Sequence, residues 1–201
     1  LSVLYGLFHR NDVVFGLLEN QAALAARLLA WFKRVPCIIN LQSGDTEEYI
    51  KGKLGPLSFL YSLVYAKKPR YVVLSRYLKE RAMAHGVPED SITIIPNGVD
   101  TKTFHCVKPK KADSVIITAS RLTLKNAVDD IIRALPIVQK SIPKANLVIC
   151  GAGEDEPKLR VLAQELGVQD SVKFEGLVPY NDLPGKLCEA DVFVRPSLSE
   201  G

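Results

Sequence analysis

The chain has 201 residues, of which 47% are hydrophobic and 24% are charged, with a formal net charge of +4. This balance is typical of a globular protein with a buried core, and it excludes an intrinsically disordered chain. No apolar run approaches the roughly 18 residues that a membrane span needs, and the start lacks a signal-peptide pattern, so the sequence indicates a soluble or peripheral protein.

The positive charge is unevenly distributed. Lys and Arg are in excess in residues 1–111, whereas Asp and Glu are in slight excess in residues 112–201. The basic residues of the first part gather between Lys51 and Arg81, and such a surface could rest on anionic lipid or hold an anionic acceptor. An ordinary solvated surface explains the same pattern, so these interpretations stay open.

Four cysteines are spread along the chain, at Cys37, Cys106, Cys150 and Cys188. They form no CxxC pair, and apart from the adjacent His105 no histidine lies near them at zinc-finger spacing. Cysteines of cytosolic proteins are usually reduced. We therefore expect four buried, free thiols.

In the first half of the chain, short apolar runs alternate with amphipathic stretches, which is the signature of βαβ units around a parallel sheet. The pattern predicts strands over residues 12–18, 36–41, 70–74 and 92–95. It predicts helices over residues 21–33 and 56–66, and a third that begins after the capping Ser75 and ends at Gly86. The aromatic helix 56–66 could dock on lipid, although packing in the core is the favoured interpretation.

The periodicity fails between Val99 and Asp113, where lysines cluster around Pro109, and this marks a linker. The alternation then restarts and predicts strands over residues 114–119, 146–150, 172–174 and 192–194 and helices over residues 127–140, 157–166 and 183–189. We therefore expect two separate α/β sheets, one in residues 1–111 and one in residues 112–201.

Three loops of the second half follow predicted strands, where open α/β folds bind their ligands. The loop after residue 119 places Arg121 and Lys125 beside the start of a helix, which suits an anion. The loop after residue 150 carries glycines, which let a ligand approach the backbone. The loop after residue 194 holds the carboxylate of Glu200. Taken singly, each loop is more often structural than functional.

The order and spacing of these segments closely resemble the C-terminal domain of the group 1, or family four, glycosyltransferases. The resemblance is carried by Ser120-Arg121-Leu122 with Lys125-Asn126, Gly151-Ala152-Gly153-Glu154, Phe174-Glu175-Gly176, Ala190-Asp191-Val192-Phe193-Val194 and Ser199-Glu200-Gly201. Gly44-Asp45 and the segment 95–100 resemble the second half of the family's N-terminal domain and its passage into the hinge. Ala127 stands where many members have glycine.

The resemblance implies the GT-B architecture, in which two Rossmann-like α/β domains with parallel sheets face a cleft; both would be incomplete in this chain. Residues 1–111 would form the later part of the acceptor-side domain and the hinge, and residues 112–201 the first part of the donor-binding domain. The family's second motif glutamate would lie eight positions after Glu200, beyond Gly201. We therefore expect this chain alone to be inactive.

The resemblance also implies the roles of single residues. Arg121 and Lys125 would bind the diphosphate of a nucleotide-sugar donor, and Glu200 would contact the donor sugar, so these three are the expected catalytic residues. Fixed cations that meet the charge growing on a leaving phosphate lower the barrier to transfer. Further contacts with substrate are expected at Gly44, Ser120, Gly151, Gly153, Glu154, Gly176, Leu177, Ser197 and Ser199.

We expect no metal and no other cofactor, because Glu154-Asp155-Glu156 is better explained as helix N-terminal charge with Pro157 in the first turn. The donor would be a UDP- or GDP-sugar, and a donor phosphate oxygen would take the acceptor proton with retention of configuration. The expected acceptor is a glycan or lipid-linked molecule, as in polysaccharide biosynthesis, with no nucleic-acid partner. The expected location is the cytoplasm or the inner face of its membrane.

Two alternatives to a hexosyltransferase stay open. A sugar-nucleotide epimerase or a phosphorylase-like enzyme can share the same architecture, and fold alone does not separate them. A non-catalytic, nucleotide-binding subunit would keep the donor site but lack the second glutamate. The context of Glu200 favours transfer.

Overall fold

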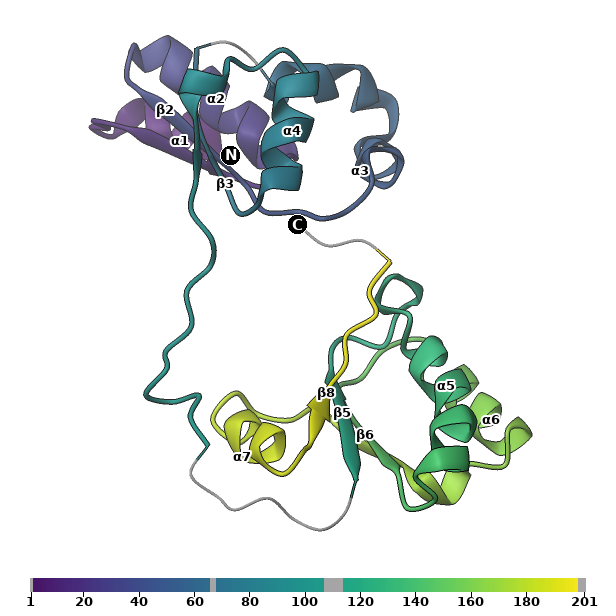
Figure 1. Cartoon of the computed structure of the whole chain (residues 1–201). Coiled ribbons are helices and arrows are strands. Elements are labelled where there is room, and N and C mark those ends of the chain that lie inside the picture. The colour runs from purple at the N-terminus through teal and green to yellow at the C-terminus, as the bar shows by residue number, and fades with distance from the viewer. Residues whose placement is uncertain (1, 66–67, 107–113, 199–201) are drawn as a thin grey trace. The chain divides into compact units, whose positions relative to one another are not determined.

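The computed structural model describes residues 2–65, 68–106 and 114–198. The chain divides into two compact units, of which unit 1 extends to Gly98 and unit 2 comprises Val99–Leu198 (Figure 1). Each unit contains one four-stranded parallel sheet. The expected α/β class with two parallel sheets is thus confirmed.

Unit 1 winds around the sheet β1-β2-β3-β4, in which each strand lies beside the next one in the chain. Parallel neighbours need a crossover between them, and helices supply it here. In chain order the elements are α1 (Ser2–Phe8), β1 (Val14–Leu17), α2 (Gln21–Lys33), β2 (Cys37–Leu41), α3 (Glu47–Leu54), the 3-10 helix η1 (Gly55–Val64), β3 (Arg70–Val73), α4 (Arg76–Ala84), η2 (Glu89–Ser91) and β4 (Ile92–Ile94).

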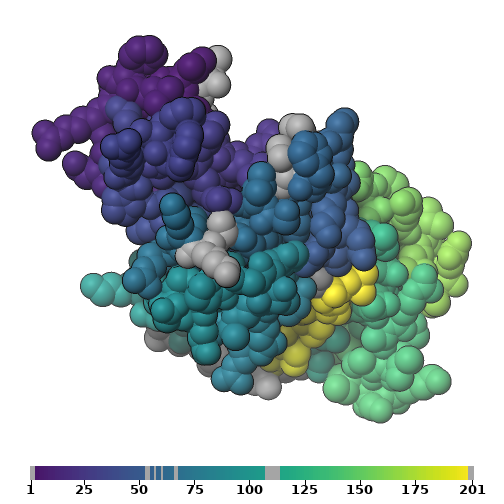
Figure 2. Space-filling model, turned by 90° about the horizontal axis from the view of Figure 1, so that it is seen from above, coloured from purple at the N-terminus to yellow at the C-terminus, as the bar shows by residue number. Residues whose placement is uncertain are grey.

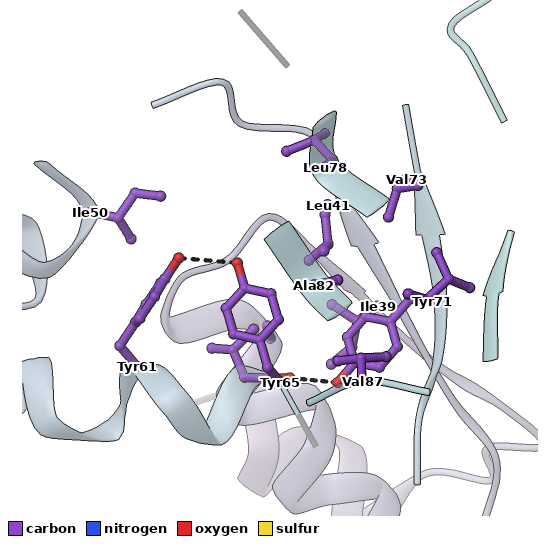
Figure 3. Packing of buried hydrophobic residues seen from close by; sticks show 13 residues of the cluster. Ile39, Leu41, Ile50, Tyr61, Tyr65, Tyr71, Val73, Leu78, Ala82 and Val87 are labelled. Atoms are coloured by element: carbon purple, nitrogen blue, oxygen red, sulfur yellow. Dashed lines mark hydrogen bonds between the residues drawn. The ribbon is translucent and has the colours of Figure 1, made fainter. Parts of the chain in front are cut away.

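The main core of unit 1 is formed by residues of the central strands β2 and β3 together with residues of η1 and α4. Ile39 of β2 and Tyr71 of β3 are fully buried in it, together with Leu78 of α4 (Figure 3). Tyr61 and Tyr65 bring their hydroxyls within 3.0 Å of each other in the same cluster. Burial of these tyrosines confirms that the aromatic segment packs in the core, although its Phe59 is 72% exposed.

A smaller cluster joins α2 to the edge strand β1. Ala26 and Leu29 of α2 pack against Val14 there. Gly16 of β1 is buried under the helix, and a Cβ at this position would lie 3.0 Å from the Cβ of Ala26 and 3.2 Å from the Cα of Ala23. Small residues on both sides therefore set how closely the helix approaches the strand.

Unit 2 has the sheet order β7-β6-β5-β8, so its last strand lies on the opposite side of β5 from the other two. Its core cluster is built from α5, α6 and the strand β6, with Ile132, Leu147 and Leu159 among the buried residues. In chain order the elements are β5 (Val115–Ala119), η3 (Leu124–Asn126), α5 (Val128–Ser141), β6 (Asn146–Cys150), α6 (Glu156–Glu165), η4 (Gln169–Ser171), β7 (Val172–Gly176), α7 (Leu183–Cys188) and β8 (Val192–Phe193).

Three features of unit 1 differ from the predicted elements. Helix α3 was not predicted, because Ile50, the one apolar side chain described as buried in it, gives no periodic signal. The hydroxyl of Thr46 caps the helix by accepting a hydrogen bond from the N–H of Tyr49. The predicted helix 56–66 is instead the 3-10 helix Gly55–Val64, and its expected last residue lies outside the described part of the chain. Helix α1 was likewise not predicted.

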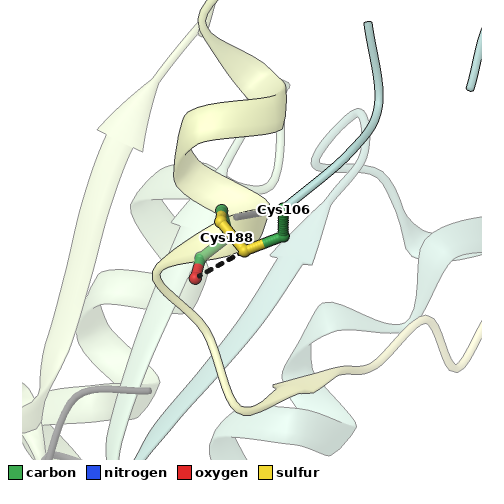
Figure 4. The surroundings of a disulfide bond; sticks show 2 residues. All are labelled: Cys106 and Cys188. Carbon is green, nitrogen blue, oxygen red and sulfur yellow. Dashed lines mark hydrogen bonds between the residues drawn. A yellow bond between two sulfur atoms is a disulfide. The ribbon is translucent and has the colours of Figure 1, made fainter. Parts of the chain in front are cut away.

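The four thiols do not all stay free, because Cys106 and Cys188 form a disulfide (Figure 4). Their Cα atoms lie 5.3 Å apart although 82 positions separate them in sequence. The expectation of reduced cysteines is therefore wrong for this pair. The bond could not be predicted from cysteine spacing, because the two cysteines lie far apart in the sequence. Cys37 and Cys150 are free, and burial raises the pKa of each thiol.

The same region bears on the boundary between the units. The sequence placed it after residue 111, whereas the compact units meet at Gly98 and Val99. The disulfide of Cys106 and the edge-to-face contact of Phe104 with Tyr180 hold residues 99–106 to unit 2.

Helices long and apolar enough to cross a membrane are absent from the described residues.

Candidate functional site

The strand order of unit 2 creates a point at its sheet where the winding reverses. β6 and β7 lie on one side of β5, and β8 lies on the other. In open α/β sheets, ligands bind outside the carboxyl ends of the strands at such a point. The loops that follow β5 and β8 are therefore the first place to look for a site, and both contain residues that the sequence predicts to bind the donor.

Backbone hydrogen bonds draw the loops after β5, β6 and β7 together at this edge. The N–H of Leu122 donates to the carbonyl of Ala152 at 3.1 Å, and the N–H of Gly151 donates to the carbonyl of Gly176 at 2.7 Å. Gly176 has a φ of 70°, which glycine adopts without strain. Three predicted segments far apart in sequence thus form one bonded framework.

The two glycines of the loop after β6 allow the backbone of another loop to pack directly against them. Gly151 has a φ of 146°, and a Cβ there would overlap the carbonyl oxygen of Ser120. A Cβ at Gly153 would overlap the carbonyl oxygen of Leu122. The sequence explained these glycines by close approach of a ligand, whereas their nearest neighbours are the backbone of the loop after β5.

A cavity of about 270 Å³ opens between these loops. Four of the predicted site residues line it: Ser120, Arg121, Gly151 and Leu177. Arg121 is exposed, whereas the hydroxyl oxygen of Ser120 is buried and has no hydrogen-bond partner among the described residues. A buried hydroxyl without a partner is costly, and Ser120 holds this one next to the cavity.

Asn126 joins the loop after β5 to the loop after β8. Its side chain is 7% exposed, and its amide nitrogen donates to the carbonyl of Arg121 at 2.6 Å. Ser197 approaches the amide oxygen of Asn126 at 3.4 Å, and the N–H of Leu198 donates to the carbonyl of Lys125 at 2.8 Å. Asn126 was not predicted as a site residue, although its place beside Lys125 was a usable signal.

The other predicted residues of unit 2 that the structure describes are absent from the cavity wall, and these include Lys125, Gly176 and Ser197. Glu154 is exposed and, with Gly153, is absent from the cavity wall. Gly44 belongs to unit 1. Ser199 and Glu200 lie outside the described residues, and the chain just before them, yellow in Figure 2, is exposed, with Leu198 at 67%.

Several charged side chains of unit 2 are either paired with one another or unfavourable for an anion. Hydrogen bonds from Lys173 and Lys186 hold the pKa of Glu175 below its usual range, and both lysine nitrogens lie 2.8 Å from its carboxylate. The N-terminal turn of α5 contains Asp129 and Asp130, which offset the helix dipole there. Arg121, Lys125 and backbone N–H groups are the groups of this edge that are predicted to bind an anion.

The described residues include no cluster of three His, Cys, Asp or Glu side chains arranged to hold a metal ion. Metal independence itself stays a prediction.

Residues 100–201 match the family model described as glycosyl transferases group 1, and residues 6–103 match that of glycosyltransferase family 4. The chain belongs to the group 1 glycosyl transferases. Among the relatives of this glycosyltransferase chain is the GDP-mannose-dependent alpha-(1-6)-phosphatidylinositol monomannoside mannosyltransferase of Mycobacterium tuberculosis. It is 32% identical over 138 residues, which cover 64% of this chain and 36% of that protein. The amylovoran biosynthesis glycosyltransferase AmsK of Erwinia amylovora is 26% identical, with 69% of this chain and 35% of that protein covered.

Solved structures show the fold of this glycosyltransferase chain. Anabaena Alr3699/HepE in complex with UDP superposes with a TM-score of 0.79 at 16% identity, over 98% of this chain and 55% of that one. Staphylococcus aureus TarM gives a TM-score of 0.74 at 16% identity, over 99% and 40%. The architecture is thus GT-B, and the chain spans about a third of the length of the curated relatives it matches.

Proposed function

We propose that the protein to which this chain belongs transfers a hexose from a nucleotide-diphosphate sugar to a glycan or lipid-linked acceptor. The observation that carries the proposal is the cavity at the winding reversal of unit 2, which Ser120, Arg121, Gly151 and Leu177 line. The GDP-mannose dependence named for the mycobacterial relative and the UDP bound to the Anabaena structure support a nucleotide-sugar donor.

In this proposal the donor's diphosphate lies against the loop after β5. Arg121 donates charged hydrogen bonds to it, and Lys125 supplies a second positive charge. Because breaking the bond to the anomeric carbon leaves more negative charge on the phosphate, both cations stabilise the transition state more than the bound donor. These fixed charges can replace a metal ion, so we propose transfer without one.

The remaining features of the reaction belong to the same proposal. Glu200 contacts the donor sugar, and a phosphate oxygen of the donor takes the acceptor proton while configuration at the anomeric carbon is retained. The predicted cytoplasmic location and contact with an anionic membrane also stay proposals. In unit 1, the exposed Trp31 and Phe32 of α2 line a separate cavity together with Arg27 and Arg34, and this aromatic and basic surface supports the membrane contact.

The test is calorimetric titration of the chain with UDP and with GDP in the presence of a chelator. We expect Arg121→Ala and Lys125→Ala each to weaken binding about tenfold or more, which corresponds to about 1.4 kcal/mol. Arg133→Ala removes an exposed arginine of the same unit that pairs with Asp129, and it should leave binding unchanged.

Equal affinities of the parent and Arg121→Ala would contradict the proposed position of the diphosphate. Binding that disappears with the chelator and returns with a divalent cation would contradict metal independence alone. If the chain binds neither nucleotide, the titration is repeated on the full-length protein, and failure there would overturn the proposed function.

A further inference from the structure

Asn126, the last residue of η3, is a buried polar residue in a loop with exposed neighbours. It is 7% exposed, whereas Leu124 of the same loop is 75% exposed and Arg121 is exposed as well. A polar side chain is costly to bury unless its donors and acceptors are paired. The partners of the Asn126 amide therefore show what this residue does.

The nitrogen of this amide closes the loop after β5. Nδ2 donates to the carbonyl of Arg121 at 2.6 Å, and the main-chain N–H of Asn126 donates to the carbonyl of Thr123 at 2.9 Å. Because a carbonyl only accepts hydrogen bonds, the amide nitrogen must face Arg121, and the amide oxygen is left for a donor elsewhere. Residues 121–126 thus form a closed turn that carries both Arg121 and Lys125.

The oxygen of the same amide meets the loop after β8. Oδ1 accepts a hydrogen bond from the hydroxyl of Ser197 at 3.4 Å, and this hydroxyl in turn accepts one from Nε of Arg195 at 3.3 Å. A serine hydroxyl can accept one hydrogen bond and donate another at the same time. A continuous chain of hydrogen bonds therefore runs from the loop after β8 to the main chain of the loop after β5.

The sheet itself holds the start of the loop after β8. β8 pairs with β5 through its short strand, and the N–H of Val194 still donates to the carbonyl of Ile117 at 2.9 Å. Further along the chain, the N–H of Leu198 donates to the carbonyl of Lys125 at 2.8 Å. The later part of the loop is therefore tied to the turn 121–126, and Asn126 supplies the side-chain part of that link.

We propose that Asn126 is a positioning residue of the donor site, which holds the turn 121–126 and the loop after β8 in one arrangement. The inference rests on the proposed function, in which the turn binds the diphosphate of the donor and Glu200, which follows the loop after β8 in sequence, contacts the sugar. Because one side chain fixes both loops, a diphosphate that orders the turn also orders the loop that leads to the sugar. The two parts of the donor therefore bind cooperatively.

The first experiment needs no ligand and follows amide hydrogen exchange of the isotopically labelled chain by NMR. We expect Asn126→Ala to speed exchange of the Leu198 amide several-fold, because the carbonyl of Lys125 that accepts its hydrogen bond is then held less firmly. Asn146→Ala is the matched control: it removes an amide that also donates to a main-chain carbonyl, that of Lys144 at 2.9 Å, at the amino end of β6. It should leave exchange of the Leu198 amide unchanged.

Ser197→Ala cuts the same link from the other side and leaves the closed turn intact, so it should speed the same exchange. Calorimetry of the full-length protein then compares GDP with GDP-mannose and UDP with UDP-glucose. We expect Asn126→Ala to weaken binding of the nucleoside diphosphate about tenfold. Ser197→Ala should leave the diphosphate unchanged and weaken the nucleotide sugar several-fold. Because both residues act through one link, their effects on the nucleotide sugar should not add in the double variant.

Exchange of the Leu198 amide at the parent's rate, in whichever of the two variants folds, overturns the inference whether or not a nucleotide binds. Additive effects of the two changes on the nucleotide sugar also overturn it, because two independent contacts with the donor would then explain both. If exchange shows the link but the full-length protein binds neither nucleotide, the proposed function fails, and the role of Asn126 in donor binding fails with it.

Discussion

At the scale of single residues, Ala127 has a backbone conformation that is unfavourable for a residue with a Cβ. It precedes α5 with a φ of 47° and a ψ of 39°, in the left-handed region, and it is 3% exposed. A residue with a Cβ pays roughly 1–2 kcal/mol for this conformation, whereas glycine adopts it freely. The resemblance to the family had marked this position as one where glycine is common.

We therefore predict that Ala127→Gly stabilises the chain by about 1 kcal/mol, because relief of strain exceeds the added entropy of the unfolded state. Urea unfolding monitored on unit 2 measures the change. Ala134→Gly, in the exposed middle of α5, is the control and should destabilise by about 1 kcal/mol. A loss of stability in both variants would show that the left-handed conformation is not strained.

Other single residues show what sequence can and cannot predict about a site. Arg121 and Ser120 were predicted because they belong to a short motif directly after a strand, and the structure places both at one cavity. The role of Asn126 was not predicted, because it depends on burial and on Ser197, which lies 71 positions later in the chain. No local pattern contains such a pair.

At the scale of elements, the packing of α2 on β1 depends on the absence of a side chain at Gly16. A Cβ there would contact Ala23 and Ala26 at 3.0–3.2 Å, and these atoms belong to the helix itself. We predict that Gly16→Val destabilises unit 1 by about 1–3 kcal/mol, the usual range for overpacking. Thermal unfolding followed by circular dichroism measures it.

Gly52 supplies the matched control on another element of unit 1. Outside the backbone of α3 itself, a Cβ at this position would meet no atom of the described residues within 4 Å, and alanine favours a helix over glycine by about 1 kcal/mol. Gly52→Ala should therefore raise the midpoint of unfolding while Gly16→Val lowers it. If Gly16→Val matched the parent, the contact between α2 and β1 would not limit the stability of unit 1.

Elements with a strong periodic pattern were predicted well. The helix predicted over residues 21–33 is α2, and the strand predicted over residues 146–150 is β6. Both carry enough apolar residues in a regular pattern to decide their type. Segment 47–64 was predicted poorly, because α3 has one described buried apolar residue and η1 follows a 3-10 rather than an α-helical repeat.

At the scale of the whole molecule, the disulfide and the segment it holds to unit 2 were not predicted from the sequence. We expect that Cys106→Ser frees residues 99–106 from unit 2 and speeds tryptic cleavage after Lys102 several-fold, because cleavage requires local opening. Mass spectrometry of a timed digest measures this. Cys37→Ser, at a free thiol, is the control, and equal rates in both variants would contradict the anchoring role.

The same bond sets the length of chain between unit 1 and its first covalent attachment on unit 2. With Cys106 bonded to α7, the chain between the end of β4 and its first covalent anchor on unit 2 stops at residue 106; once the bond is reduced, it continues to β5 at Val115. A longer tether lowers the effective concentration of one tethered unit at the other. Since reducing compartments open disulfides that oxidising compartments preserve, the thiol balance around the protein would set the length of chain that joins the two units.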